Sequence, residues 1–531
     1  MTKLVPTASA MDALTTTALL VAVFLAGCPS WQRPVSMPPE LTEAGVQARL
    51  GLVVDPHVHL AETSVRPGPG SQPSLTLALA ASTEPASAGF SLADAIAFAQ
   101  HHSPRLQSAR AAMERARGQE QVAFAPFLPE VDLLSQGGAT SNNQGPGASG
   151  PTGFILPSGT PGTHSYVQTE VQFLWTVYDF GRRAGHYRQA AAREQIAELQ
   201  LVRADQTVQF DVTAAYLHIL LARASLRVQE DAIRQAEATL KDARARFEAG
   251  VADPDDVLRA EVHLSESRDA FVSAQEEELV ALAQLNNVMG RPAALPLRVH
   301  DLQPPPPAAR PSLEESLEMA AAQRPEIGFA RHMVVAAQEG LVAARAGGLP
   351  RIFVRASTGR VDGAQVLTGW QAGAGLHLEV PLYTGGRLQG EIHTAAAEVA
   401  AAVADAQTLL DGISLEVTRA FRSEAAAGQR IELSRTAVTA AQENLRLVRV
   451  KYRNGNATPT DIVDAEAALT QSQQRLHSAI YSYLAALARL DYAMGRQQGT
   501  ILRQASVPEG APAPWPTEQF VSWPAAQGVP R

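Results

Sequence analysis

Residues 246–261 read RFEAGVADPDDVLRAE, and residues 451–466 read KYRNGNATPTDIVDAE. The glycine, the proline and the closing Ala-Glu recur at matching places, 205 residues apart. The same offset relates the Met-Gly-Arg sequences that begin at Met289 and Met494. Two long units therefore superpose without gaps over their second halves, which indicates a tandem duplication.

The first halves of the two units differ by one insertion. Pro104 and Pro129 correspond to Pro325 and Pro350 at an offset of 221, which exceeds the later offset by 16 residues. The extra residues lie between Pro129 and Tyr178, where SNNQGPGASGPTGFILPSGTPGTH shows no periodicity. Clustered Gly, Pro, Ser and Thr without periodicity favour an exposed loop tip in the first unit.

Two long stretches without proline predict helices that would each reach on the order of 100 Å at 1.5 Å per residue. Aromatic residues make up only 5% of the chain, which suits closely packed, alanine-rich helices better than one globular core. A turn at Gly250 or Gly455 follows each long helix, and a return helix follows the turn, so two antiparallel hairpins result. The long helices are expected at Ala184–Phe247 and Arg387–Tyr452, and the return helices at about Pro254–Val288 and Pro459–Ala493.

The second long helix carries a coiled-coil seam. Its apolar positions alternate in steps of four and three until Glu424 interrupts them. This period is typical of coiled coils built from small and branched side chains. The seam comprises Ile392, Ala396, Val399, Val403, Ala406, Leu410, Ile413, Val417 and Ala420.

The segments that lead into the long helices alternate with a period of two, with one apolar face and one largely polar face. Their length suits a tilted crossing of a bilayer, which takes roughly 9 to 11 residues. Alternation alone does not separate such strands from those of a half-buried soluble sheet. The strands are expected at Tyr166–Val177 and Trp370–Val380, with shorter partners at Glu130–Gln136 and Arg351–Thr358.

Four strands cannot close a barrel in lipid. An open sheet edge there leaves backbone groups unpaired, at a cost of several kcal/mol each. If the strands cross a membrane, the chain must therefore oligomerise. A trimer would supply twelve strands and twelve helical columns, enough for a wide conduit.

The chain has one cysteine, Cys28, at the end of a short apolar run, Ala18–Leu25. The run is too short to span a bilayer and reads as the core of a signal peptide. The LAGC sequence that closes it resembles a bacterial lipobox, which implies cleavage before Cys28 and its lipidation. The residue after the cysteine is Pro29 and not Asp, which resembles the pattern of lipoproteins that are sent to the outer membrane. Against a signal peptide, Lys3 is the only positive charge before the apolar core, and Asp12 lies just before that core. A buried thiol is the competing interpretation.

Two pairs of histidines stand at spacings that could suggest a metal site. His57 and His59 resemble the first ligand pair of amidohydrolases, but such enzymes need an eight-stranded barrel, whereas the downstream chain predicts helical repeats. His101 and His102 are adjacent, so on a helix they point about 100° apart and do not readily share a metal. We expect no catalytic site, metal or cofactor.

The charge of the chain bears on its partners. The net charge is −9 and the isoelectric point is near 5.8. A nucleic-acid partner would require clustered Lys and Arg, and the sequence has no such stripe, so no nucleic acid is expected.

From about Ser91 to Arg496, three quarters of the chain, the duplicated plan resembles the outer-membrane efflux protein family, the TolC-like outer-membrane factors. The motifs are Leu-Pro at 128–129 and 349–350 before a strand, VYDFGRR at 177–183 and PLYTGGR at 381–387 after one, and the two hairpins. The resemblance implies a mainly α fold with a small β part. It also implies a homotrimer with a twelve-stranded β-barrel in the outer membrane on an α-helical barrel in the periplasm, a duct without a catalytic site.

The resemblance further implies a periplasmic adaptor and an inner-membrane pump of the RND or ABC type, besides outer-membrane lipid. The adaptor would dock at the hairpin tips, Gly250, Val251, Gly455 and Asn456. Ala252 and Ala457 depart from the family's pattern, because some members place a basic residue there to link protomers. The expected segments are 1–27 signal peptide, 28–90 lipidated tether, 91–311 first repeat, 312–496 second repeat and 497–531 Pro/Ala-rich tail.

The family's duct closes at its periplasmic end by acidic rings and links between helices. The matching positions are Asp461 and Asp464, with Tyr452 facing Asp256 of the first repeat. Asp461 and Asp464 share one helical face, and three copies around an axis would repel one another, bind cations and raise carboxylate pKa values.

Helix capping competes with the gate interpretation. Thr458 reads as a cap with Asp461 reaching back to it, and residues 253–256 read the same way. Asp464 lies beyond the first turn, so capping does not explain it, although Arg259 on a neighbouring hairpin would neutralise it.

Three functions of different kinds remain. The first is an outer-membrane exit duct of a tripartite system that exports small molecules such as drugs or metal ions. The second is the same duct serving type I protein secretion. The third is a lipid-anchored periplasmic coiled-coil scaffold, which leaves the four alternating strands unexplained.

Overall fold

The computed structural model describes residues 89–142, 162–302, 311–363 and 369–496. By its contacts the chain divides into a large unit, residues 87–290 and 297–531, and a small one, residues 1–86 and 291–296. Of the small unit only 291–296 is described, and it forms a turn in which the Leu295 N–H donates to the Pro292 carbonyl.

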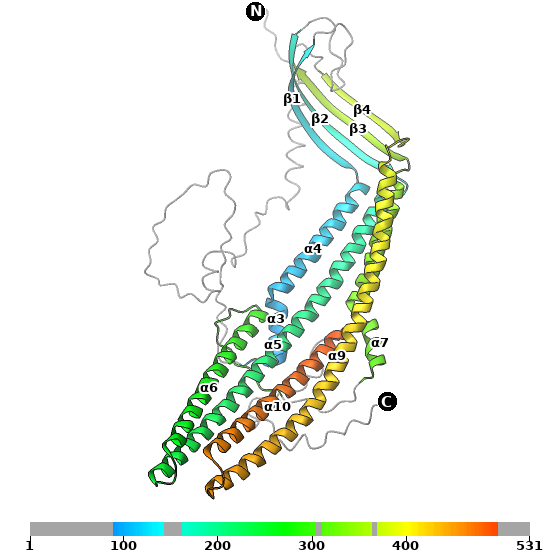
Figure 1. Ribbon diagram of the computed structural model, residues 1–531. Coiled ribbons are helices and arrows are strands. Elements are labelled where there is room, and N and C mark those ends of the chain that lie inside the picture. The colour runs from blue at the N-terminus through cyan, green and yellow to red at the C-terminus, as the bar shows by residue number, and fades with distance from the viewer. Residues whose placement is uncertain (1–88, 143–161, 303–310, 364–368, 497–531) are drawn as a thin grey trace, which may run out of the picture. The chain divides into compact units, whose positions relative to one another are not determined.

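Apart from the short helix η3 of the first repeat, the two repeats contain the same elements in the same order (Figure 1). The first repeat runs α3 (Leu92–His102), α4 (Pro104–Phe124), η3 (Ala125–Phe127), β1 (Glu130–Asn142), β2 (Gly162–Tyr178), α5 (Arg182–Glu248) and α6 (Pro254–Met289). The second runs α7 (Leu313–Gln323), α8 (Pro325–Ala346), β3 (Arg351–Gly363), β4 (Gly369–Glu379), α9 (Arg387–Arg453) and α10 (Pro459–Ala493). The mainly helical fold with a small β part and the two hairpins are confirmed.

Local sequence explains where the matching helices begin. Ser91 and Ser312, 221 residues apart, each accept a hydrogen bond from the third backbone N–H of the helix that follows. The acidic residues Asp94 and Glu315 bond back to the cap, which completes a capping box in both repeats. The sequence offset therefore corresponds to repeated local structure.

The long helices α5 and α9 each contain 67 residues, and each turns back at a glycine. Gly250 and Gly455 have φ angles of +70° and +76°, which only glycine adopts readily. At each tip a backbone N–H reaches back five residues, from Val251 to the Arg246 carbonyl and from Asn456 to the Lys451 carbonyl. Helix α5 packs on α6, α9 packs on α10, and α10 also packs on α5, so the hairpins lie side by side (Figure 1).

The four strands form one antiparallel sheet in the order β1-β2-β3-β4. All four lie where predicted, but β1, β2 and β3 extend further, because the backbone ladder continues where side-chain alternation stops. Within the described residues, β1 and β4 are edges with no further strand beside them. Leu134 and Leu174 are exposed on one face, whereas most of the exposed apolar side chains lie on the other: Val131, Leu133, Val167, Val171, Trp175, Trp370, Leu376 and Leu378.

The largest core cluster joins α3, α5, α6 and α10 and includes Leu92, Leu217, Leu285 and Leu484. Tyr216 is fully buried there, and its hydroxyl donates to the Phe90 and His300 carbonyls, at 3.0 and 2.6 Å. A buried hydroxyl with two acceptors fixes the short segment around His300 against α5.

The coiled-coil seam of α9 is covered only in part within one chain. Ile413, Val417 and Ala420 are buried in a second core cluster with α7 and α10. Upstream, Val403 and Leu410 remain 41% and 43% exposed, whereas Ala395 and Ala402 are buried. A different face of α9 is buried in this upstream part, because α8, rather than α10, packs on it. Glu424, predicted to interrupt the seam, is itself buried at 2% exposure.

The turns from strand to long helix repeat an unusual backbone. Gly181 and Gly386 precede α5 and α9 with φ angles of +100° and +86°. The residues before them also have positive φ, +54° for Phe180 and +60° for Gly385. The second repeat therefore uses glycine where the first places a phenylalanine in the left-handed region. Among the described helices, none has a stretch apolar and long enough to cross a membrane.

Candidate gate and hairpin interface

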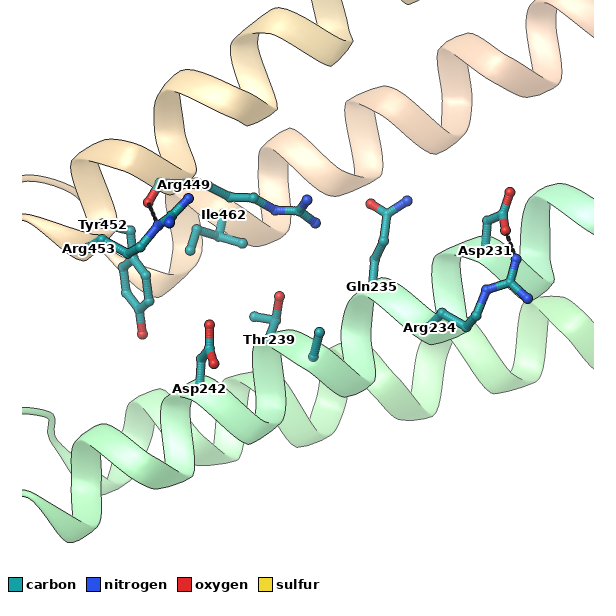
Figure 2. Close-up of a pocket in the computed structure, with 10 residues that line it drawn as sticks. Asp231, Arg234, Gln235, Thr239, Asp242, Arg449, Tyr452, Arg453 and Ile462 are labelled. Carbon is teal, nitrogen blue, oxygen red and sulfur yellow. Dashed lines mark hydrogen bonds and ion pairs between the residues drawn. The ribbon is translucent and has the colours of Figure 1, made fainter.

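A groove of about 510 Å³ lies where the two hairpins meet, near their tips (Figure 2). Helix α5 forms one wall, and α9 and α10 form the other. Its lining is mostly polar and charged: Asp231, Arg234, Gln235, Ala238, Thr239, Asp242, Arg449, Tyr452, Arg453 and Ile462. The predicted gate residue Tyr452 therefore lies at the contact between the two hairpins.

Glu466 of α10 ties four helices together beside this groove. Its Oε1 accepts from Thr239 Oγ1 of α5 at 2.9 Å and from Arg449 Nη2 of α9 at 3.0 Å. Its Oε2 lies 3.5 Å from His263 Nε2 of α6. The Glu466 residue is only 2% exposed, so a single carboxylate joins both hairpins in a place shielded from water.

The surroundings of Glu466 favour its charged form. Burial by itself raises the pKa of this carboxyl. The hydrogen bonds from His263, Arg449 and Thr239 outweigh that effect and hold the pKa below its usual range. The hydrogen bonds from Thr239 and Arg449 both go to Oε1, while the buried Oε2 has only His263 near it, at 3.5 Å, so removal of Thr239 and Arg449 would leave a buried charge without hydrogen bonds.

Tyr452, at the end of α9, is covered by Arg246 of the first hairpin. The Arg246 guanidinium carbon lies 3.8 Å from the centre of the Tyr452 ring, and Nη2 donates to the Tyr452 carbonyl at 2.8 Å. Tyr452 is 6% exposed. Burial raises the pKa of its hydroxyl, Arg246 lowers it, and Asp256 and Asp242 raise it. Asp256 is thus near Tyr452, but the direct contact comes from Arg246.

Asp461 and Asp464 lie on the first turns of α10 and are both exposed. The capping prediction for Asp461 is confirmed: its Oδ2 accepts from the Thr458 N–H and hydroxyl, at 2.7 and 2.8 Å. The hydrogen bond from the Thr458 backbone, more than that from its side chain, holds the pKa of Asp461 below its usual range. Within one chain, Asp461 is a capping residue.

The matching prediction for the first repeat is confirmed in position only. Asp253 stands at the cap of α6, but its side chain makes no capping hydrogen bond. The reciprocal bond between side chains is also missing, because two ionised carboxylates, Asp253 and Asp256, have no proton to share. Within one chain Arg259 lies 3.5 Å from Asp255 of its own helix, and its predicted approach to Asp464 from a neighbouring hairpin stays a prediction.

The face of the sheet opposite its exposed apolar side chains carries a polar ladder. Gln136 Nε2 donates to Gln168 Oε1 at 2.8 Å, and Gln168 Nε2 donates to Glu170 Oε2 at 3.0 Å. Gln172 also donates to Glu170. An apolar face and a hydrogen-bonded polar face on one sheet suit a wall between lipid and water.

The comparison with families of known proteins identifies the fold. The family described as outer membrane efflux protein matches residues 95–291 and 316–496. The chain belongs to this family. The two matches coincide with the two repeats, and the members of this outer membrane efflux protein family are ducts rather than enzymes.

Relatives within the outer membrane efflux protein family are named for different roles. Alkaline protease secretion protein AprF of Pseudomonas aeruginosa is 24% identical over 341 residues, 62% of this chain and 70% of AprF. Outer membrane efflux protein BepC of Brucella suis biovar 1 is 27% identical over 315 residues, 58% of this chain and 68% of BepC. The crystal structure of the outer membrane protein VceC from Vibrio cholerae shares the fold, with a TM-score of 0.67 and 21% identity over 76% of this chain and 96% of VceC.

Other predicted site residues lie elsewhere. Cys28, His57 and His59 fall outside the described residues. His102 lies at the end of α3, where its ring stacks on Phe98 at 4.0 Å and its Nδ1 lies 3.0 Å from the Phe98 carbonyl. That contact is local packing.

Glu466, Arg449 and Thr239 were not predicted as parts of the contact between the two hairpins. A signal was available, because Arg244 and Glu261 hold the same positions in the first repeat and also form an ion pair, at 2.7 Å. An Arg and a Glu retained together at one offset would have indicated a conserved link between the two helices of each hairpin.

Proposed function

We propose that the protein is the outer-membrane exit duct of a tripartite efflux system, exporting small molecules such as drugs or metal ions across the periplasm and outer membrane. One observation carries the proposal. The sheet has an exposed apolar face, a polar face and two free edges within the described residues, and β2 and β4 lead directly into 67-residue helices. Membership in the outer membrane efflux protein family supports it.

In this proposal three copies pair their free edges, β1 of one with β4 of the next, into a twelve-stranded β-barrel. Closure satisfies the backbone groups of both edge strands, which a lipid environment demands. The polar ladder at Gln168 and Glu170 then lines the water-filled side, and the exposed apolar face contacts outer-membrane lipid. The long helices continue as a helical barrel through the periplasm.

The hairpin tips are the proposed periplasmic gate and docking end. Asp461, Asp464, Asp256 and Tyr452 lie on elements that meet there, and both aspartates on α10 are exposed. The tip residues Gly250, Val251, Gly455 and Asn456 would contact a periplasmic adaptor, and an inner-membrane pump of the RND or ABC type would supply energy. The exposed Val251, at 73%, supports an apolar contact at this end.

The amino-terminal segment is proposed as a lipid anchor. Cleavage before Cys28 and acylation of that residue would fix residues 28–90 to the inner leaflet of the outer membrane. Mass spectrometry of the mature amino terminus tests this, because acylation adds the mass of the lipid to the Cys28 peptide. An unmodified terminus upstream of Cys28 would contradict it.

Type I protein secretion is a second candidate function, favoured by the similarity to AprF, whose name states alkaline protease secretion. The two functions use the same duct and differ in cargo. Deletion of the gene from its host separates them, because loss of efflux sensitises the cell to small toxic molecules. Loss of secretion instead removes a protein from the culture medium.

The first test of the duct is planar-bilayer conductance of the detergent-solubilised oligomer, with its mass measured in parallel. We expect trimers that give small, cation-selective openings. A monomer or dimer that never conducts would contradict the duct and favour the lipid-anchored scaffold.

A further inference from the structure

A second groove, of about 470 Å³, lies between α8 and α9 of the second repeat, next to the point where α7 meets α8. Both of its walls come from one repeat of one chain, so it is separate from the groove between the two hairpins. Its volume falls within the usual range of small-molecule sites, roughly 300 to 1,000 Å³. The groove is therefore large enough for a small organic molecule, and neither the proposed gate nor the proposed docking end uses it.

One part of the lining is apolar. Phe329 and Met333 stand one helical turn apart on α8, and Leu409 and Ile413 have the same spacing on α9. Between them on α9 the lining is a glycine, Gly412, and a Cβ built there meets no atom within 4 Å. An apolar body in the groove therefore has four side chains to contact, and the glycine leaves open a space that a larger side chain would fill.

The charged part of the lining holds more acids than bases. Among the described residues the lining includes one base, Arg324, and three acids: Glu326, Asp405 and Glu416. Arg324 Nη2 donates to Glu416 Oε2 at 2.5 Å, and Arg203 Nε of α5 lies 2.7 Å from Glu326 Oε1. No described residue forms a hydrogen bond or an ion pair with the Asp405 side chain. The groove therefore keeps one carboxylate whose charge is not balanced.

A buried oxygen of the lining also lacks a donor. Glu326 Oε2 is shielded from solvent and has no hydrogen bond within the described residues. A buried acceptor without a donor is costly, and an N–H group of a ligand would remove that cost. Arg324, whose side chain is 1% exposed, also has a buried Nε without a partner, but its guanidinium is already neutralised by Glu416. The unbalanced charge of Asp405 and the free oxygen of Glu326 thus both favour a cationic donor.

The equivalent place in the first repeat, where α4 packs on α5, has a different lining. The counterparts of Phe329, Met333 and Leu409 are small residues: Ser108, Ala112 and Ala204. Gly412 corresponds to Thr207, and Asp405 corresponds to the uncharged Gln200. The large apolar side chains, the open glycine and the unbalanced carboxylate occur together only in the second repeat of the two. They do not follow from the duplicated helix packing.

We propose that this groove binds a small organic cation, an amine whose charged ammonium group carries an apolar body. Asp405 balances the charge of the ammonium, Glu326 supplies a further acceptor, and the apolar body lies on the apolar side chains of both helices. The ring of Phe329 suits the same ligand, since a cation is attracted to the face of an aromatic ring. The site goes beyond the proposed export function, because it needs neither a second copy of the chain nor an open channel.

Equilibrium dialysis of the full-length protein in nanodiscs of neutral phosphatidylcholine tests the site, with empty nanodiscs as the blank. The probe is 4-phenylbutylamine, whose ammonium is charged at pH 7, as that of lysine is. Two comparison compounds, 4-phenylbutanol and 4-phenylbutanoate, have the same apolar body with no charge and with a negative charge. We expect saturable binding of one amine per chain, with an affinity at least about fivefold higher than for either comparison compound.

Two glycines of α9 provide a matched pair of variants. Both Gly412 and Gly390 are exposed, and a Cβ at either meets no atom within 4 Å. Gly412→Leu fills the open space of the groove, whereas Gly390→Leu makes the same change about 33 Å away along the helix. Leucine favours a helix more than glycine does, so both variants should fold. We expect Gly412→Leu to abolish saturable binding of the amine and Gly390→Leu to bind it as the unchanged chain does.

A third variant, Asp405→Asn, removes the charge and keeps the size of the side chain. It should weaken binding of the amine about fivefold, the upper range for an exposed ion pair, and leave binding of 4-phenylbutanol unchanged. Circular dichroism and oligomer mass are measured on every variant before dialysis, so that a loss of binding is compared between folded proteins.

Each contrary result overturns a stated part of the inference. Absence of saturable binding of the amine by the unchanged chain would overturn the site. Equal affinity for the amine and for 4-phenylbutanoate would overturn the class of ligand, because charge would then play no part. Undiminished binding in Gly412→Leu would overturn the location between α8 and α9. None of these results bears on the proposed duct, which is tested by conductance and by oligomer mass.

Discussion

The two hairpins contain the same ion pair in opposite surroundings. Arg244 and Glu261 of the first are 57% and 43% exposed, whereas Glu466 of the second is 2% exposed and bonds to Arg449. Both hairpins keep an arginine and a glutamate at the same two places, and in both these side chains link the two helices of the hairpin. The difference arises from the neighbouring hairpin, because the first hairpin covers Glu466, whereas no other described helix covers Glu261 to the same extent.

This comparison shows what duplication does to an interface. When a duplicated hairpin packs on its repeat, each hairpin keeps contact residues on two surfaces. Within one chain only one of these surfaces is covered by the other hairpin. Phe247 is therefore an exposed aromatic residue with a buried counterpart, Tyr452. Exposed apolar positions with buried counterparts identify a surface for assembly more sharply than exposure alone.

The largest expected effect on stability is at Leu484, whose counterpart 205 residues earlier in the first repeat is Leu279. Leu484→Ala should lower the free energy of unfolding by about 3 kcal/mol, because it empties a core position shared with α5. Leu279→Ala should change the unfolding of the chain by less than about 0.5 kcal/mol, since that side chain is 63% exposed. Urea unfolding in detergent, followed by circular dichroism, measures both.

The association of copies is measured on the same variants. Leu279→Ala should weaken this association, so its oligomer should dissociate at a higher protein concentration than that of the unchanged chain. Equal losses of chain stability in the two variants would show that the counterparts do not differ in burial, and the comparison would fail.

A smaller effect is expected at the carboxylates. Glu466→Ala should cost about 2 kcal/mol, because it leaves Thr239 and Arg449 without their buried acceptor. In the separated chain Glu261→Ala should cost less than about 1 kcal/mol, as for an exposed ion pair. Urea unfolding under dissociating conditions measures the pair, and a cost at Glu261 as large as at Glu466 would contradict the assigned burial.

The contribution of Glu466 to the stability of the chain should decrease as the pH falls. Its folded pKa lies below the usual 4.5, so its stabilisation is fully present above that value and is lost as the pH falls through the folded pKa. His263 and Arg449 are the charged or titratable groups that face it. The stability difference between the unchanged chain and Glu466→Gln should therefore shrink below about pH 4.5, and a difference that grew there would contradict the sign.

The sequence predicted local features well and contacts between distant segments poorly. The return helix from Pro459 to Ala493 is confirmed residue for residue, because proline at its start and the apolar period both leave local signals. Strand β1 was predicted to end at Gln136 but continues to Asn142, since a backbone ladder needs no side-chain pattern. The fold class followed from such local signals together with the repeat.

The candidate site shows the same division. The Thr458–Asp461 cap spans three residues and could be predicted, whereas the bond from Thr239 to Glu466 joins residues 227 apart. No periodicity within one segment encodes such a contact. Asp253 holds the matching cap position but makes no side-chain hydrogen bond there, a difference that the shared sequence pattern does not reveal.

The gate proposal predicts different effects for the two aspartates of α10. Asp464→Ala should raise single-channel conductance or reduce block by cations without loss of stability, because the side chain is exposed and lies beyond the cap. Asp461→Ala should have the same electrical effect and also lower the stability of the chain, because it removes the carboxylate half of the capping box. Bilayer recordings and urea unfolding of the same samples measure both.

The counterparts in the first repeat provide the control. Asp256 lies at the matching place of α6, but the position that corresponds to Asp464 is Arg259, which lies near Asp255. Arg259→Ala should therefore leave cation block unchanged or strengthen it. Unchanged conductance and block in Asp461→Ala, Asp464→Ala and the double variant would remove the gate assignment.

The smallest expected effect concerns the strand-to-helix turns. Gly385 has a φ angle of +60°, so Gly385→Ala should cost about 1 kcal/mol. Phe180 holds nearly the same angle, +54°, and its ring contacts Tyr178 with 4.7 Å between centroids. Phe180→Gly relieves the backbone but loses that ring contact and gains unfolded-state entropy, so its net effect should be within about 0.5 kcal/mol. Thermal unfolding of both variants compares the turns, and a large loss in Phe180→Gly would show that the aromatic contact, rather than the backbone, fixes the turn of the first repeat.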